Sequence, residues 1–232
     1  YYNPYIDRWE WQRPRLFQTV EDIFPLSFTL PYIIPMLENA GALTFVPRER
    51  DIQQHEVIVD NDSMGGQSQV IAYSENREAD QAIWFTGERP AFGIGSPPYE
   101  EGENPFRQGT HRFTWSDTVE TAHIDWIPYI PEPGEYAVYI SFVSSPESVD
   151  DAHYTVFHDG GKTEFLVNQQ IGGQTWVYLG TFYFNSGFSQ TEGMVRLDNK
   201  SRTAGMKISA DAVRFGGGMG VIARNGRTSG RA

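Results

Sequence analysis

The chain has 232 residues, of which 39% are hydrophobic and 14% aromatic, and its formal net charge is −12. This composition can bury a core and excludes an intrinsically disordered protein. The acidic balance excludes the basic face of a nucleic-acid binder and disfavours anionic lipid surfaces. The absence of Cys excludes disulfides and thiolate metal sites, and no apolar run of about 18 residues predicts a membrane span.

The first 60 residues mix helical and strand patterns. Apolar residues between 30 and 37 recur at helical spacing, and the prolines of the same stretch predict a kink, because each removes a backbone donor. We expect a kinked helix that begins near Glu21 or Pro25 and ends at Gly41, a favourable residue for a helix C-terminus. A buried strand over residues 43–46 follows.

The remainder of the chain has strand patterns. A loop rich in Gly, Pro and Glu over residues 91–109 separates two short strands. From residue 118 to 216, strand-like runs and turns alternate at roughly even spacing, which indicates a β-sandwich. The expected strands cover residues 57–59, 82–85, 113–115, 136–142, 152–158, 162–167, 176–183, 194–197 and 207–215.

Four runs between Trp126 and Phe215 point to a known domain. They are Tyr129-Ile130-Pro131-Glu132-Pro133-Gly134-Glu135-Tyr136, Gly173-Gln174-Thr175-Trp176-Val177-Tyr178-Leu179-Gly180, Val195-Arg196-Leu197 and Ala210-Asp211-Ala212-Val213-Arg214-Phe215. With these runs the zone resembles the golvesin and xanthan-lyase type of carbohydrate-binding-like domain. The resemblance implies a jelly-roll-like sandwich, of the kind appended to bacterial surface proteins and polysaccharide-active enzymes.

A second resemblance lies in the first 62 residues. The predicted helix ends at Gly41, an apolar strand follows, and the strand leads into Arg48-Glu49-Arg50-Asp51. This order resembles the front of zinc-dependent N-acetylmuramoyl-L-alanine amidases, in large Bacteroidetes proteins that carry the β module as an insertion. The resemblance implies that Glu21, 20 positions before Gly41, is a zinc ligand. It also implies that Arg48 and Arg50 contact the peptidoglycan substrate.

The zinc site implied by this resemblance is incomplete in the chain. A catalytic zinc needs about three protein ligands and an open position for water. The two histidines of the family would lie before Tyr1 and after Ala232, so zinc is expected in the intact parent and not on this chain alone. The alternatives stay open: Glu21 fits the first turn of a helix, where the dipole favours acids, and Arg48, Arg50 and Asp51 fit a structural ion-pair network.

Aromatic residues supply candidates for glycan binding, because flat rings pack against pyranose faces. Those of the β-rich part more often belong to a core. The candidate glycan platform is Trp126, Trp176 and Tyr178, chosen from a set that also includes Trp84, Trp115 and Phe182.

Three other groups of residues contain side chains that can bind metals. His153 and His158 lie five positions apart in one predicted strand and fall on opposite faces, so they cannot share a metal. His111, His123 and Asp125 are expected to be loop and edge residues. The Asp60-Asn61-Asp62 and Asp150-Asp151 runs have oxygen ligands that calcium accepts, but the spacing favours turns.

The sequence therefore predicts an α+β protein: a partial amidase-type α/β segment followed by an all-β, jelly-roll-like sandwich. The predicted parts are residues 1–62 (amidase-like), 63–117 (connecting strands and loops), 118–216 (sandwich) and 217–232 (exit linker).

The predicted function is that of a fragment of a cell-envelope, zinc-dependent peptidoglycan amidase. The alternatives are a non-catalytic surface module with a degenerate amidase scaffold, and an accessory domain of a polysaccharide lyase or hydrolase. Expected partners are peptidoglycan or a surface polysaccharide and the remaining segments of a longer parent, with no nucleic acid and no membrane span. The resemblance implies export to the periplasm, outer membrane or cell surface.

Overall fold

The computed structural model describes residues 53, 55–62, 72–77, 83–93 and 104–217, and short pieces of the first 40 residues, namely 2–3, 5, 7–9, 29–33, 36–37 and 40. The chain divides into two compact units. One unit comprises Tyr1–Arg50, Pro97–Asn104 and Met219–Ala232, and the other comprises Asp51–Ser96 and Pro105–Gly218.

The α+β prediction is wrong, because the described part of the chain is nearly all β. In the first unit, β1 (Tyr2–Asn3) pairs with β2 (Arg8–Trp9), and η1 (Thr29–Ile33) is a five-residue π-helix. This short helix and two further helical residues, Met36 and Leu37, are what the structure describes where a kinked helix up to Gly41 was predicted. Pro31 lies inside it, and a proline removes a backbone donor and clashes with the preceding turn.

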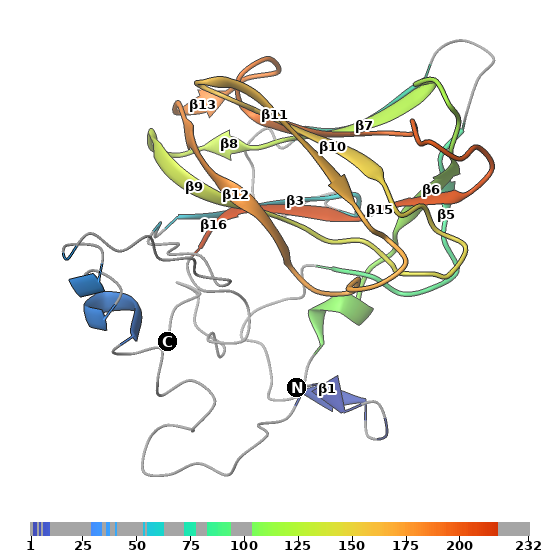
Figure 1. Cartoon of the computed structure of the whole chain (residues 1–232), viewed down its shortest axis with the longest axis horizontal. Helices are drawn as coiled ribbons and strands as arrows, with labels where there is room; N and C mark the ends of the chain where they lie inside the picture. The colour runs from blue at the N-terminus through green and yellow to red at the C-terminus, as the bar shows by residue number, and fades with distance from the viewer. Residues whose placement is uncertain are drawn as a thin grey trace. The chain divides into compact units, whose positions relative to one another are not determined.

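The second unit is built on two antiparallel sheets (Figure 1). The five-stranded sheet contains, in spatial order, β11 (Gly161–Val167), β10 (Ala152–His158), β14 (Met194–Asp198), β7 (Ala122–Ile127) and β4 (Ala72–Arg77). The four-stranded sheet contains β12 (Val177–Phe184), β9 (Gly134–Ile140), β16 (Ala212–Gly216) and β3 (Glu56–Asp60).

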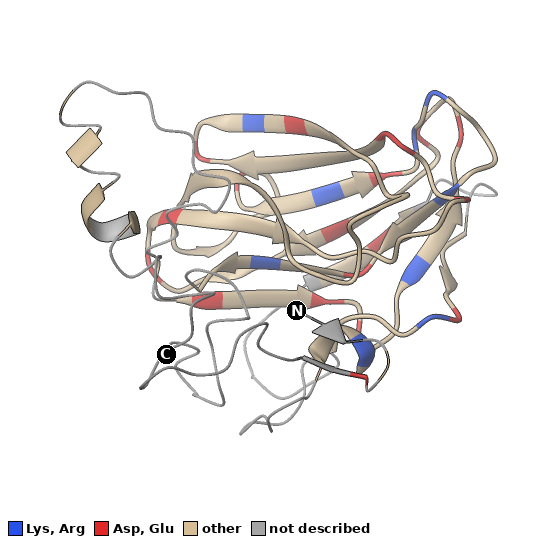
Figure 2. Ribbon diagram, turned by 60° about the horizontal axis from the view of Figure 1, so that its bottom comes forward, with Lys and Arg blue, Asp and Glu red and all other residues tan. Residues whose placement is uncertain are grey.

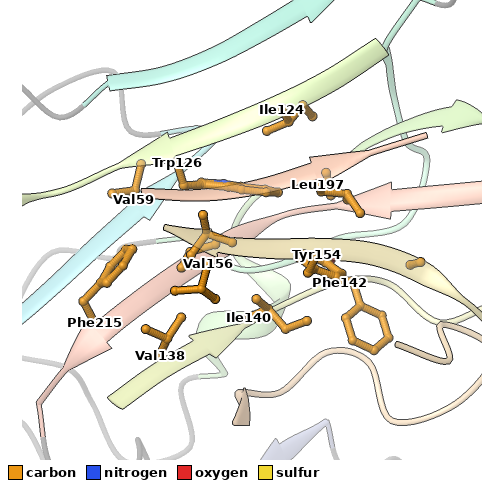
Figure 3. Close-up of a cluster of buried hydrophobic side chains, with 14 of the residues drawn as sticks. Val59, Ile124, Trp126, Val138, Ile140, Phe142, Tyr154, Val156, Leu197 and Phe215 are labelled. Atoms are coloured by element: carbon orange, nitrogen blue, oxygen red, sulfur yellow. The ribbon is translucent and has the colours of Figure 1, made fainter. Parts of the chain in front are cut away.

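The hydrophobic core lies between these two sheets, as Figure 3 shows. Along β7, Ala122, Ile124 and Trp126 are fully buried, because alternate side chains of a strand point to the same face. The Trp126 ring stacks on Tyr154 of β10, with ring centroids 6.4 Å apart. The four-stranded sheet contributes residues from all four of its strands, including Val59, Val138, Ile140, Phe184, Val213 and Phe215.

The outer face of the five-stranded sheet is polar. Figure 2 shows acidic and basic positions on the same strands of the sandwich. Arg196 of β14 donates two hydrogen bonds to Asp125 of β7, at 2.7 and 2.9 Å. On the edge strand β11, Lys162 pairs with Glu164 at 2.7 Å. Apolar residues inside and paired charges outside are the usual pattern of an antiparallel sheet with one solvated face.

Two smaller sheets complete the unit. One contains β15 (Lys207–Ala210), β6 (Arg112–Trp115) and β5 (Phe85–Thr86), and the other pairs β8 (Tyr129–Ile130) with β13 (Gly187–Phe188). A 3₁₀-helix, η2 (Pro105–Arg107), precedes β6. None of the described helical segments is long and apolar enough to cross a bilayer.

The single strand predicted over residues 207–215 is in fact two strands in different sheets. They separate at Asp211, which is fully buried. Its carboxylate accepts hydrogen bonds from the Ser141 hydroxyl and the Phe92 amide, 3.2 Å away. Its main-chain oxygen accepts one from Trp126 Nε1 at 3.0 Å. Both side-chain hydrogen bonds go to one oxygen of this buried carboxyl group, and together with the Trp126 bond they fix the point where the chain changes sheet.

Candidate functional site

A shallow hollow with a volume of about 570 Å³ lies at the edge of the small β15-β6-β5 sheet. Its lining combines apolar residues and polar residues: Ile83, Phe85, Thr114, Trp115, Ser116, Asp117, Thr121 and Asn199. Large, partly apolar concavities with a few polar groups are where proteins most often bind ligands.

The apolar side of this hollow consists of half-exposed side chains. Ile83 is 49% exposed, Phe85 45% and Trp115 47%. Phe113 joins the rings into a row: it lies opposite Phe85 across the strand pair, with centroids 5.6 Å apart, and 6.1 Å from Trp115. Strand alternation explains the row, because Phe113 and Trp115 are two residues apart on β6, while Thr114 between them points inward and is buried.

The polar residues of the lining mostly stabilise the loops around it. The Asn199 side chain accepts hydrogen bonds from the amides of Thr121 and Ala122 and donates to Trp115 O and to the Thr121 hydroxyl. The Ser116 hydroxyl donates to Thr203 O at 2.7 Å and accepts from the Met206 amide. These bonds fix the end of β6 and therefore the position of Trp115.

Two carboxylates and one ammonium group lie around Trp115. Asp117 lines the hollow, and its Oδ1 accepts a hydrogen bond from the Thr118 amide at 2.6 Å. Lys207 is paired with Trp115 across β15 and β6, and its Nζ lies 5.8 Å from the Trp115 ring centroid. Lys207 Nζ also contacts Glu147 at 2.7 Å, and this hydrogen bond lowers the pKa of Glu147.

Arg112 holds β5 in place beside the hollow. Its guanidinium donates to both carboxylate oxygens of Glu75 on β4, at 2.5 and 3.0 Å, and to Trp84 O at 2.9 Å. It also donates to the Thr86 hydroxyl. Trp84 and Thr86 flank Phe85 in the sequence, so the position of Phe85 in the hollow depends on Arg112.

The residues predicted from the amidase resemblance cannot be placed. Glu21, Arg48 and Arg50 lie outside the described residues. Among the residues that the structure does describe, no group of three or more His, Cys, Asp or Glu side chains is arranged to hold a metal ion.

His153 and His158 lie on opposite faces of β10, as predicted. His153 forms a hydrogen bond with Asp198 on the polar face. The His158 ring stacks on Phe182, with ring centroids 4.8 Å apart.

The predicted glycan platform is brought together only in part, because Trp176 and Tyr178 lie around the Tyr139–Arg214 pair and Trp126 does not. Trp126 is fully buried in the main core, so neither face of its ring is open to a sugar. Trp176 packs against Phe92 and Phe106, with centroids 4.7 and 5.5 Å away. Tyr178 packs on Tyr139 at 5.6 Å, and its hydroxyl bonds the Thr181 hydroxyl. Trp176 and Tyr178 are partly buried and lie away from the Trp115 hollow.

Sequence reasoning included Trp115 among the possible aromatics but did not select it. A usable signal was present: Phe113-Thr114-Trp115 places two rings on one face of a short strand. The flanking residues Ser116 and Asp117 are polar, whereas Trp126 is followed by Ile127 and preceded at alternate positions by Ile124 and Ala122. Polar neighbours favour an exposed ring and apolar neighbours a buried one.

Known proteins share this fold and part of the sequence. A xanthan lyase from Bacillus sp. (strain GL1) is 32% identical over 95 residues, which cover 41% of this chain and 10% of the relative, so the chain spans about a tenth of its length. A solved structure of a Paenibacillus xanthan lyase superposes with a TM-score of 0.53 and 21% identity, over 75% of this chain and 14% of the other. This second likeness shows the fold alone.

The remaining comparison concerns the family. The sequence model of the Golvesin C-terminal domain matches residues 100–217, just over half of the chain. The match covers most of the sandwich and includes Trp115, Asp117 and Asn199 of the hollow. The chain therefore belongs to the Golvesin C-terminal domain family.

Proposed function

We propose that this chain is a carbohydrate-binding module of a larger exported protein that acts on or is attached to a polysaccharide. The observation that carries the proposal is the half-exposed Trp115 ring over the hollow. A ring held in this position by neighbouring hydrogen bonds is ready to pack against the CH groups of a pyranose. The family membership supports the proposal, as does the curated relative, which is named a xanthan lyase.

The exposure of these side chains is itself an argument for binding. Ile83, Phe85 and Trp115 lie together in the hollow and keep about half of their surface in water. Burying apolar surface stabilises by about 25 cal/mol per Å². Clustered exposed apolar side chains therefore mark surfaces at which a partner binds.

Substitution of Trp115 tests the proposal. The chain and its Trp115→Ala variant would be compared by affinity gel electrophoresis and calorimetry against a panel of soluble polysaccharides and peptidoglycan fragments. We expect at least one polysaccharide to bind and Trp115→Ala to weaken it by at least about tenfold, because truncation of a central aromatic residue removes much of the binding energy.

The matched control is Tyr183→Ala. Tyr183 is a similarly exposed aromatic residue (46%) on β12, and it does not line the hollow. Equal losses for Trp115→Ala and Tyr183→Ala would refute the assignment of the site. Absence of binding to every glycan, with a folded protein, would refute the proposed function.

Amidase activity stays a separate sequence prediction for the intact parent. It depends on Glu21 as a zinc ligand and on Arg48 and Arg50 as substrate contacts, and these residues lie outside the described part. Neither relative reported above is named an amidase. The direct test is peptidoglycan cleavage by the zinc-loaded parent and by its Glu21→Gln variant, with metal content measured alongside.

A further inference from the structure

We propose that the Trp115 hollow selects neutral, hydroxyl-rich sugar units over acidic ones, and that Asp117 sets this preference. The inference rests on the proposed function, because it concerns the ligand class of the same hollow. Two observations support the preference: the polar groups of the lining that can still bind a ligand, and the charge of those groups.

The donors of Thr114, Ser116 and Asn199 in the lining are already engaged within the protein, which leaves the Trp115 indole and the Thr121 hydroxyl as its side-chain donors. The Thr114 hydroxyl donates to Ile83 O at 2.9 Å. The Ser116 hydroxyl donates to Thr203 O, and the Asn199 amide donates to Trp115 O and the Thr121 hydroxyl. A sugar carboxylate placed over Trp115 would lose its water and gain none of these donors, which is unfavourable for a charged group.

Asp117 provides the opposite kind of group. Its Oδ1 accepts from the Thr118 amide and hydroxyl, whereas Oδ2 has no hydrogen-bond partner among the residues that the structure describes. An ionised carboxylate only accepts hydrogen bonds. Sugar hydroxyls can donate to Oδ2, and hydrogen bonds to a charged acceptor are stronger than those between neutral groups. A sugar carboxylate would instead be repelled.

The neighbouring charges do not reverse this preference. Lys207 is the cation beside Trp115, but its ammonium group is paired with Glu147 at 2.7 Å. Asp117 is the charged residue in the lining of the hollow, so an acidic sugar meets a like charge there, which adds to the loss of hydration.

The experiment compares polymers that differ only in charge. Polygalacturonate, polymannuronate and polyglucuronate would each be tested beside their carboxyl-reduced, neutral forms by affinity gel electrophoresis and calorimetry at low salt. For each pair that binds in a Trp115-dependent way, we expect the neutral form to bind at least about tenfold more tightly. This ratio corresponds to about 1.4 kcal/mol.

Asp117→Asn tests the residue itself. This variant removes the charge and keeps the side-chain shape, so it should bind the neutral polymer more weakly and reduce the neutral-to-acidic ratio at least about threefold, since the charge-assisted bonds and the repulsion are both lost. The control Asp150→Asn removes an exposed carboxylate that does not line the hollow and should leave the ratio unchanged.

The outcomes separate the two proposals. Trp115-dependent binding without preference for the neutral form would overturn the inference and leave the proposed function standing. An unchanged ratio in Asp117→Asn would overturn the role of Asp117. If no polymer in the full panel binds in a Trp115-dependent way, the proposed function fails and the inference fails with it.

Discussion

Asp60, at the end of β3, and Asp211, between β15 and β16, are two buried carboxyl groups of the sandwich. Asp60 is the register partner of Ala212, the residue that follows Asp211. Burial raises the pKa of Asp60 to about 7 and raises the pKa of Asp211 well above its usual range, and the charge of Asp60 adds to the effect on Asp211. At these two positions the fold tolerates carboxyl groups by favouring their protonated forms.

This burial predicts a stability that depends on pH. The folded chain holds the Asp60 proton up to about pH 7, whereas the unfolded chain releases it near 3.8. The resulting stability is fully present below the unfolded value and is lost as the pH rises through 7. Between pH 8 and pH 5 we expect Asp60 alone to increase the free energy of unfolding by about 2–3 kcal/mol, measured by urea denaturation.

Two variants identify the source of this pH dependence. Asp60→Asn has no titrating proton at this position and should make the curve less steep over the same range, with the contribution of Asp211 remaining. Asp150→Asn, which removes an exposed carboxylate, should retain the full slope. An unchanged slope in Asp60→Asn would contradict the assignment. Below about pH 4, carboxylates whose pKa is lowered in the fold, such as Asp151, lose stability instead, so the measurement stays above that pH.

At the scale of strands, alternation in the sequence predicted most of the sandwich. The pattern of residues 152–158 and 162–167 led directly to β10 and β11, because one face is apolar and the turn at Gly160-Gly161 is a hairpin signal. Residues 72–77 were missed, since Ala-Tyr-Ser-Glu-Asn-Arg is polar and edge strands need only one paired side. The strand change at Asp211 depends on contacts with Ser141 and Phe92, which lie far away in sequence.

The candidate site was less predictable than the fold, because the exposure of its residues depends on contacts between segments far apart in the sequence. The exposure of Trp115 depends on β5 being only two residues long, which leaves the edge of β6 open at the hollow. The burial of Trp126 depends on its stacking with Tyr154 of β10 and on the core between the two sheets. Both are tertiary effects, so composition and spacing alone could not separate the two tryptophans.

The small sheet offers a test of how β5 is held. Arg112→Gln would remove the bonds to Glu75, Thr86 and Trp84 O. We expect a loss of about 1–2 kcal/mol of stability, since hydrogen bonds to charged groups contribute about that much and the ion pair is only partly buried. Glycan binding should weaken as well, because Phe85 loses its support.

Lys162→Gln is the control for this prediction. Lys162 and Glu164 form an exposed pair on the edge strand β11, and such pairs contribute at most about 1 kcal/mol. Urea denaturation and glycan affinity would be measured for both variants. An Arg112→Gln protein with unchanged stability and affinity would show that β5 is positioned by its neighbours without the guanidinium.

At the scale of the whole molecule, strands from before residue 118 belong to the sandwich. β3 pairs with β16 over five residues, and β4 pairs with β7 over six. β6, which carries Trp115, pairs with β15. Val59 and Trp84 are buried members of the main core. The predicted boundary at residue 118 therefore separates strands that pair with one another.

Two fragments test this boundary. We expect residues 51–218 to fold cooperatively with a β-type far-UV circular dichroism spectrum. The fragment 118–216 lacks β3, β4, β5 and β6, so β7 and β16 become unprotected edges and the core loses Val59 and Trp84. Removal of one large buried side chain costs about 2–5 kcal/mol, and a domain has only about 5–15 kcal/mol of stability. The shorter fragment should therefore be unfolded or aggregated at room temperature, and a cooperative urea transition equal to that of the longer fragment would restore the boundary at 118.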